Sequence, residues 1–411
     1  MNEMKNAPLV PITDVLSFIV DNRGKTVPTA ESGFPLIATN CVHNERLYPV
    51  FENIRYVSEY TLHNWFRAEL KANDILFVNK GTPGRCCLVP DPVSFCAAQD
   101  MIGLRCDEQK VYYRYLLMVL RSTTTQKFIS NYHVGIAIPH FKKEDLSKLL
   151  IPLPSMEYQK RIGDLYFDIC EKEEHNNSIC ADLEAMAKLL YDYWFVQFDF
   201  PDENGKPYKS SGGKMVWNEE LKREIPEGWK ITTIGNITIC HDSERIPVAG
   251  KDRESMKGNI PYYGATGIMG YVNRAIFNGD YVLMAEDGSV MDSEGHPVVQ
   301  RVSGACWINN HAHVLESTNG YSCKLLMMIL KDIPVMKIKT GSIQMKINQE
   351  NMNSYRIIDI PDCLKQTICE KLDVFDEQLL HLHNENKQLV SVRDFLLPML
   401  MNGQVKVGGK E

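Results

Sequence analysis

Two short motifs in this 411-residue chain contain residue types that bind phosphate or activate water. Gly24-Lys25-Thr26 has the ending of a phosphate-binding loop, but the position five residues before Gly24, which needs a glycine, is Ile19. His43-Asn44-Glu45 has the His-x-Glu of zinc deaminases, yet no Pro-Cys-x-x-Cys follows it. A methyltransferase Asn-Pro-Pro-Tyr/Phe motif and its glycine-rich S-adenosylmethionine loop are both absent. The sequence therefore predicts no catalytic residue and no cofactor.

Carboxylates and histidines suggest two further kinds of site. Asp202, together with Glu220-Leu221-Lys222, matches the loose pattern in which two carboxylates hold Mg2+ and a lysine orients water, so a Mg2+-dependent nuclease is one alternative. His311-Ala312-His313 puts two imidazoles on one face of a strand, but no third metal ligand is near in the sequence, so groove or core histidines are favoured. The twelve cysteines contain no Cys-x-x-Cys pair and are expected to be small buried residues. No metal site is predicted.

Each half of the chain offers cations, histidines and amides, some of which lie close to a glycine that occurs in both halves, Gly135 or Gly341. Lysine and arginine bind phosphates or guanine edges, and glutamine binds adenine edges, so these groups are candidate DNA contacts. In the first half the candidates are Arg23, Lys25, Lys80, Arg85, His133, His140, Lys142 and Lys143. In the second half they are His311, His313, Lys337, Lys339, Ser342, Gln344 and Lys346. For any single residue the alternative is a solvated surface charge.

The elements that position these residues occur twice. The segment from Gly135 to Leu146 reappears as Gly341 to Met352, at an offset of 341 − 135 = 206 residues. Ile151-Pro152-Leu153-Pro154 returns as Ile358-Asp359-Ile360-Pro361. A repeat of this length is a duplicated domain rather than one unit of a solenoid. Two similar globular modules, each followed by a helix, are therefore predicted.

Each copy continues into a long segment in which apolar residues recur every three or four positions, which is typical of a coiled-coil seam. The first seam consists of Ile162, Leu165, Ile169, Lys172, Asn176, Ile179, Leu183, Met186, Leu190 and Tyr193. The second consists of Ile368, Leu372, Phe375, Leu379, Leu382, Asn386, Leu389, Arg393, Leu396 and Leu400. An antiparallel pair that sets Asn176 against Asn386 would fix the helix register, and the alternative is that each asparagine lies at a solvated helix edge.

Composition agrees with this division into domains. The predicted order is a first module over 1–154, a helix over 155–197, a linker over 198–225, a second module over 226–361, a helix over 362–402 and a tail over 403–411. The net charge is −7, and residues 155–225 hold 9 Lys+Arg against 15 Asp+Glu, so the acid lies in the first helix and linker rather than in the modules.

The chain has a polar start and no uncharged run of about 18 residues, so no membrane partner is predicted and the protein is expected in the cytoplasm.

Three strings near the middle of the chain resemble the central region of type I restriction-modification specificity (S) subunits. They are Tyr193-Trp194-Phe195-Val196-Gln197-Phe198-Asp199-Phe200-Pro201, Lys209-Ser210-Ser211-Gly212-Gly213 and Ile225-Pro226-Glu227-Gly228-Trp229. Arg23-Gly24-Lys25-Thr26, Ile151-Pro152-Leu153-Pro154 and the duplicated layout extend the resemblance over essentially the whole chain.

The resemblance implies an α+β fold in which two similar α/β target-recognition domains are separated by two long antiparallel coiled-coil helices with a pseudo-twofold internal repeat. It further implies that each domain reads one half of a split, asymmetric site in double-stranded DNA and that the helices dock two methyltransferase subunits. Motor-nuclease subunits would join these in a restriction complex, and the chain itself would be non-catalytic. Two alternatives stay open, the Mg2+-dependent nuclease and an adaptor that does not bind DNA.

Overall fold

The computed structural model describes residues 3–22, 24–132, 139–341 and 345–405. It divides into two compact units, one formed by residues 1–179 with 382–411 and the other by residues 180–381. Each unit contains one globular module and a part of each of two long helices, α4 and α9. In the part of the chain that the structure describes, we find no helix with the length and apolar character needed to span a membrane.

The first module is built on an antiparallel sheet with the strand order β2-β8-β5-β6. A second sheet, β4-β3-β7, and the antiparallel pair β1–β9 complete it. Its strands are β1 (Leu9–Pro11), β2 (Leu16–Val20), β3 (Phe34–Ile37), β4 (Arg55–Val57), β5 (Ile75–Val78), β6 (Cys86–Leu88), β7 (Cys96–Ala97), β8 (Met101–Cys106) and β9 (Leu150–Pro152). Its helices are η1 (Ile12–Val15), η2 (Thr39–Cys41), α1 (Glu59–Asn64), α2 (Tyr113–Arg121), α3 (Thr123–Asn131) and η3 (Lys143–Lys148).

The second module is built on a six-stranded sheet with the order β13-β18-β16-β17-β14-β15. Its strands are β12 (Lys230–Thr233), β13 (Thr238–Cys240), β14 (Ile260–Tyr263), β15 (Ile268–Val272), β16 (Phe277–Ala285), β17 (Val299–Ile308), β18 (Ala312–Ser317), β19 (Lys339–Thr340), β20 (Lys346–Ile347) and β21 (Arg356–Asp359). Its helices are α5 (Ile234–Ile237), η5 (Asp242–Glu244), α6 (Gly250–Ser255), α7 (Cys323–Lys331), η6 (Val335–Lys337) and α8 (Gln349–Ser354).

The two modules share one topology, which confirms the predicted duplication. The order β2-β8-β5-β6 in the first corresponds to β13-β18-β16-β17 in the second. β3 has an antiparallel neighbour in β4 and a parallel one in β7, just as β14 has β15 and β17. The pair β1–β9 corresponds to β12–β21, so each module closes by pairing its first strand with the strand that leads into a long helix.

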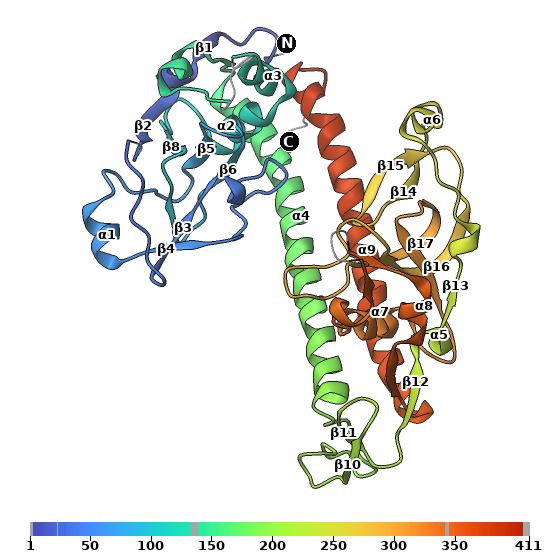
Figure 1. The fold of residues 1–411 in the computed structure, drawn as a ribbon. Coiled ribbons are helices and arrows are strands. Elements are labelled where there is room, and N and C mark those ends of the chain that lie inside the picture. Colours follow the sequence, from blue (N-terminus) through green and yellow to red (C-terminus); the bar gives the residue numbers. More distant parts are fainter. Residues whose placement is uncertain (1–2, 23, 133–138, 342–344, 406–411) are drawn as a thin grey trace. The chain divides into compact units, whose positions relative to one another are not determined.

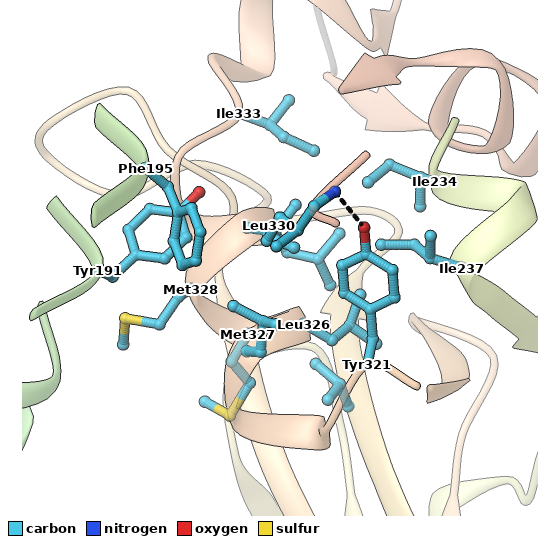
Figure 2. Close-up of a cluster of buried hydrophobic side chains, with 14 of the residues drawn as sticks. Tyr191, Phe195, Ile234, Ile237, Tyr321, Leu326, Met327, Met328, Leu330 and Ile333 are labelled. Atoms are coloured by element: carbon cyan, nitrogen blue, oxygen red, sulfur yellow. Dashed lines mark hydrogen bonds between the residues drawn. The ribbon is translucent and has the colours of Figure 1, made fainter. Parts of the chain in front are cut away.

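Helix α7 shows how apolar sequence builds the core of the second module. Every residue from Lys324 to Leu330 is buried, and the helix packs on β16, β17 and β18. Figure 2 shows Leu326 and Leu330 between the aromatic pair Tyr191 and Phe195 on one side and α5 on the other. A fully buried leucine or isoleucine contributes about 1.5 to 3 kcal/mol, so this cluster is a main source of the stability of the unit. Figure 1 places α7 against the sheet.

The two long helices are α4 (Met156–Tyr191), which ends in a π-helical turn at Asp192–Val196, and α9 (Asp362–Met401). The linker between α4 and the second module contains the antiparallel hairpin β10 (Met215–Asn218) and β11 (Arg223–Pro226). In the first unit, buried residues of α4 such as Ile162 and Tyr166 share a core with Leu397 and Leu400 of α9. In the second unit, Ala187 and Tyr191 of α4 share a core with Ile368 and Leu372 of α9.

Asn176 and Asn386 face each other in the first unit, as the heptads predict. Asn176 is fully buried, and its Nδ2 donates to Asn386 Oδ1 at 2.8 Å and to Glu385 Oε2 at 2.7 Å. Asn386 Nδ2 donates in turn to Asn177 Oδ1 at 2.9 Å, and nearby Arg393 pairs with Glu173 at 3.0 Å. Low-numbered residues of α4 therefore contact high-numbered residues of α9, so the helices are antiparallel here.

We expect Asn176 and Asn386 to be energetically coupled. In a double-mutant cycle with Asn176→Leu and Asn386→Leu, each single change leaves a polar amide facing a leucine, whereas the double change removes both amides. The coupling free energy from urea unfolding should be about 1 kcal/mol, and the double variant should be at least as stable as the chain with both asparagines. Strictly additive effects of the two substitutions would show that the pair does not fix the register.

The heptad pattern misplaced three side chains of α4. Ile179, Met186 and Tyr193 were predicted in the seam but are 46%, 53% and 37% exposed. The reason is geometric, because an α-helix with 3.6 residues per turn drifts by about 20° per heptad relative to a repeat of 3.5. Towards its end α4 therefore buries Ala187 and Tyr191 instead.

Candidate nucleic-acid interface

Several predicted DNA contacts of the first module lie on two neighbouring segments, 79–85 and 139–143. Lys80 and His140 form an antiparallel bridge, and Gly81 N donates to the carbonyl of Pro139 at 3.0 Å. Lys80 and Lys142 are exposed, whereas Arg85 and His140 are half-buried. The remaining candidates are placed as follows: Lys143 pairs with Asp21 at 3.4 Å, Lys25 is exposed, and Arg23 and His133 lie outside the described residues.

In the second module, Asp287 brings two candidates together. His311 Nδ1 lies 2.6 Å from Asp287 Oδ1, and Lys346 Nζ lies 3.7 Å from the other carboxylate oxygen. Lys346 lies on β20, whose partner strand β19 begins with Lys339. The other candidates are placed as follows: Lys337 is exposed on η6 beside a cavity of about 630 Å³, and Ser342 and Gln344 lie outside the described residues.

The prediction that His313 contacts DNA is wrong in this structure. The residue is 1% exposed, and both ring nitrogens are occupied. Nδ1 lies 2.5 Å from Asp242 Oδ2, and Nε2 lies 2.8 Å from the carbonyl oxygen of Ile347. His313 lies within β18, where Ala312 to Leu315 are all buried, whereas His311 precedes the strand and stays exposed.

Asp242, His313 and Cys240 bring three potential ligand atoms within 4.8 Å of one another. Their surroundings already supply the positive charge that a metal ion would bring. Arg245 lies 3.4 Å from Asp242 and 2.7 Å from Glu286, and its guanidinium is largely buried. Burial alone would raise the pKa of Asp242, but its hydrogen bond with His313 and the charge of that imidazole hold the pKa below its usual value. The arrangement fits a buried ion-pair network better than a metal site.

The acidic motif of the nuclease alternative serves other contacts. Asp202 Oδ1 accepts hydrogen bonds from the backbone N–H groups of Asn204 and Lys206, both at 2.8 Å, and so closes a turn. Glu220 pairs with Arg356 at 2.6 Å, and Lys222 pairs with Glu219. The two carboxylates and the lysine are therefore engaged separately.

A cationic and aromatic surface around α6 and the β14–β15 hairpin escaped the sequence analysis. Arg253 lies over the ring of Tyr262 and Arg274 over the ring of Trp307, with guanidinium-to-centroid distances of 5.0 and 5.2 Å. On the hairpin, Met269 and Tyr271 are 56% and 52% exposed. Arg274 is exposed and Arg253 half-buried, and cations beside exposed apolar and aromatic side chains are suited to contact phosphates and base edges. Interleaved acids such as Asp252 cancel the local charge in the sequence, which is why no basic cluster stood out.

Comparison with known proteins identifies the family. A family model for the type I restriction modification DNA specificity domain matches residues 9–185 and, a second time, residues 226–391. The chain belongs to this family. The two matches fall on the two copies of the repeat, so the duplication in the sequence and the shared strand order are one property of the family domain.

Individual members of the specificity family resemble the chain over most of its length. The type I restriction enzyme MjaIX specificity subunit of Methanocaldococcus jannaschii is 25% identical over 320 residues, which cover 72% of this chain and 70% of that protein. The HindI specificity subunit of Haemophilus influenzae is 21% identical over 360 residues, which cover 71% and 77% of the two chains. The crystal structure of an S subunit from M. genitalium matches the fold with a TM-score of 0.60 at 16% identity, covering 98% of each chain.

Proposed function

We propose that this chain is the sequence-recognition subunit of a type I restriction-modification complex and that each module reads one half of a bipartite, asymmetric site in double-stranded DNA. The observation that carries the proposal is one sheet topology used twice with different loops. Between β3 and β4 the first module inserts residues 38–54, whereas β14 and β15 are joined by residues 264–267 alone. A constant frame with divergent loops suits two readers of different base sequences.

The charge distribution supports local rather than general attraction to DNA. The net charge of −7 does not favour binding over the whole surface. Lys80 and Lys142 in the first module, and Lys339 and Lys346 in the second, lie on short segments beside the sheets. At physiological salt, screening limits the range of the interaction between exposed charges to about 8 to 10 Å. Such segments can therefore attract phosphate despite the acidic residues elsewhere in the chain.

Two exposed apolar stripes suggest how the chain binds its partners. We define the α4 stripe as Met186, Leu189 and, in the π-helical turn, Tyr193, and the α9 stripe as the exposed Val392 and Phe395 with the half-buried Met399. The stripes have the same spacing and lie 206 positions apart, since 392 − 186, 395 − 189 and 399 − 193 all equal 206, which is within one residue of the offset of 358 − 151 = 207 at the entry to the helices. Leu189 and Phe395 are 69% and 67% exposed.

Apolar residues at three- and four-residue steps on an exposed helix face are suited to bind another helix. Because the two stripes repeat one pattern, we infer that they dock two copies of one partner, a methyltransferase subunit. The chain itself is then non-catalytic, methyl transfer belongs to the docked subunits, and motor-nuclease subunits join in a restriction complex.

Methylome mapping in cells with and without this chain tests the proposal. Deleting its gene should remove methylation from one split, asymmetric motif and leave other motifs unchanged, because the methyltransferase would lose its reader. An exchange of residues 226–361 for the same module of a relative should change only one half of that motif. If deletion left every methylated motif in place, the recognition function would be wrong. Mg2+-dependent DNA cleavage by the chain alone, lost in Asp202→Ala and Glu220→Ala, would favour the nuclease alternative instead.

A further inference from the structure

In each module a buried side chain donates a hydrogen bond to an equivalent backbone carbonyl, but the two donor side chains differ in chemistry. In the first module, Asn79 Nδ2 donates to the carbonyl of Phe141 at 2.9 Å. In the second, the donor to the carbonyl of Ile347 is His313 Nε2 at 2.8 Å. Asn79, Phe141 and Ile347 are 0% exposed and His313 is 1% exposed. An amide does not titrate, whereas an imidazole does so near neutral pH.

The backbone around these residues shows that Phe141 and Ile347 are equivalent. Phe141 N donates to the carbonyl of Asn79 at 2.8 Å, and Ile347 N donates to the carbonyl of Glu286 at 2.9 Å. Asn79 directly follows β5 and Glu286 directly follows the corresponding strand β16. Phe141 precedes the exposed Lys142, and Ile347 follows the exposed Lys346. Each donor therefore fastens a segment that carries a predicted DNA contact.

Both nitrogens of His313 face acceptors. Nδ1 lies against the carboxylate of Asp242 and Nε2 against the carbonyl of Ile347, and neither oxygen can donate. Both contacts are hydrogen bonds only when both nitrogens carry a proton, which makes the ring an imidazolium. Burial opposes this charge, yet the hydrogen bond and the charge of Asp242 raise the pKa of His313 above its ordinary value.

The groups that face His313 come from three directions. Asp242 on η5 pairs with it and also accepts from Val314 N at 2.9 Å. Glu286, after β16, lies 3.9 Å from Nδ1 and is paired with Arg245. Cys240 on β13 completes the cluster. A neutral imidazole keeps only one of its two N–H groups, and the carboxylate is the stronger acceptor because its hydrogen bond is charge-assisted. Deprotonation therefore releases the carbonyl of Ile347.

We propose that His313 is a positioning residue whose protonation holds the β19–β20 segment in place, so that DNA recognition weakens with rising pH in the second module but not in the first. The inference rests on the proposed function, because it treats Lys339 and Lys346 as DNA contacts. The pH dependence has a definite direction. Because folding raises the pKa of His313, the stabilisation that its protonated ring provides is fully present below the ordinary histidine pKa of about 6.5, and it is lost as pH rises through the pKa of the folded state.

Hydrogen–deuterium exchange of the full chain tests the positioning without DNA. Between about pH 6 and about pH 9, after correction for the intrinsic exchange rate, protection of the Ile347 amide should fall roughly three- to tenfold, the range expected for one lost hydrogen bond. Protection of the Phe141 amide should stay constant. In His313→Gln, whose amide does not titrate, protection of Ile347 should be independent of pH. The matched control His311→Gln, an exposed histidine two positions away, should retain the dependence.

Binding to a fluorescein-labelled mixed-sequence duplex tests the recognition. In the unmodified chain, the slope of log K against log salt concentration should become shallower between pH 6 and pH 9, by the amount that corresponds to a loss of about one to two phosphate contacts. In His313→Gln this slope should not change with pH. Equal pH responses at Phe141 and Ile347, or a pH response that survives in His313→Gln, would overturn the positioning role. Protection of Ile347 that required added Zn2+ would overturn it as well, in favour of a metal site. If exchange follows the expected pattern but no variant binds the duplex, the proposed DNA recognition is what fails.

Discussion

The double substitution Leu189→Asp and Phe395→Asp is expected to abolish assembly with the methyltransferase subunit while leaving a folded chain. Both side chains are exposed, so aspartate costs little in the free protein, whereas in a docked helix pair it would bury an unpaired charge. Central apolar anchors of an interface are worth about 2 kcal/mol or more each, which corresponds to at least about a 30-fold loss of affinity per site. Mass photometry of the mixture measures the outcome directly.

The single substitutions make this test sharper. Because the two stripes are repeats, Leu189→Asp alone and Phe395→Asp alone should each leave a complex with one partner subunit instead of two. Leu9→Asp is a suitable control, since Leu9 is 64% exposed but lies on β1, outside both stripes. It should assemble normally. Assembly of the double variant with two partner subunits at unchanged affinity would show that docking uses another surface.

The substitution Trp307→Ala is expected to have the largest effect on the stability of the second module. Trp307 is 0% exposed, its Nε1 donates to the carbonyl of Ile246 at 2.8 Å, and it packs against Tyr262. Removing a buried tryptophan costs about 3 to 5 kcal/mol through lost transfer energy and a cavity. Because Trp307 fastens the loop before α6, amides of residues 245–272 should also lose protection in hydrogen exchange.

Trp217→Ala is the matched control, since Trp217 is 56% exposed on β10 and should change the free energy of unfolding by no more than about 0.5 kcal/mol. Because the chain has two compact units, a single unfolding transition cannot be assumed. Urea unfolding should therefore be followed separately in each unit, by hydrogen exchange of peptides from both. A loss below about 1 kcal/mol for Trp307→Ala would mean that the site collapses around the smaller side chain.

The helices could be predicted from sequence because they depend on local periodicity, and the duplication because two distant segments are similar. The segments from Gly135 to Leu146 and from Gly341 to Met352 are similar at a constant offset. Apolar residues that recur every three or four positions indicate a helix directly. The exposed face of α4 could not be predicted in this way. A strict heptad places Met186 in the seam, and only the accumulated drift of a real α-helix turns it outwards.

The surroundings of His313 show why the candidate site was harder to predict. Its two hydrogen-bond partners lie 71 and 34 positions away in the sequence. In the pattern His-Ala-His, either histidine could be the exposed one, and the choice depends on where β18 begins, because Ala312 is its first residue and His311 lies outside it. The cations on α6 were missed for a different reason. Asp252 and Glu254 alternate with Lys251 and Arg253, so the net charge of this segment is zero and no basic cluster is visible in the sequence.

The division of the chain into units also fixes an order of synthesis. Residues 180–381 form one unit without interruption, whereas the first unit needs residues 382–405 as well as the N-terminal part. At about 5 to 20 residues per second, the intervening segment delays completion of the first unit by roughly 10 to 40 s. During that time the faces of Ile162 and Tyr166 that later meet Leu397 and Leu400 have no partner from α9. The module made first on the ribosome is thus finished last, and a chain that stops short of α9's final turns leaves its N-terminal core open to chaperones and proteases.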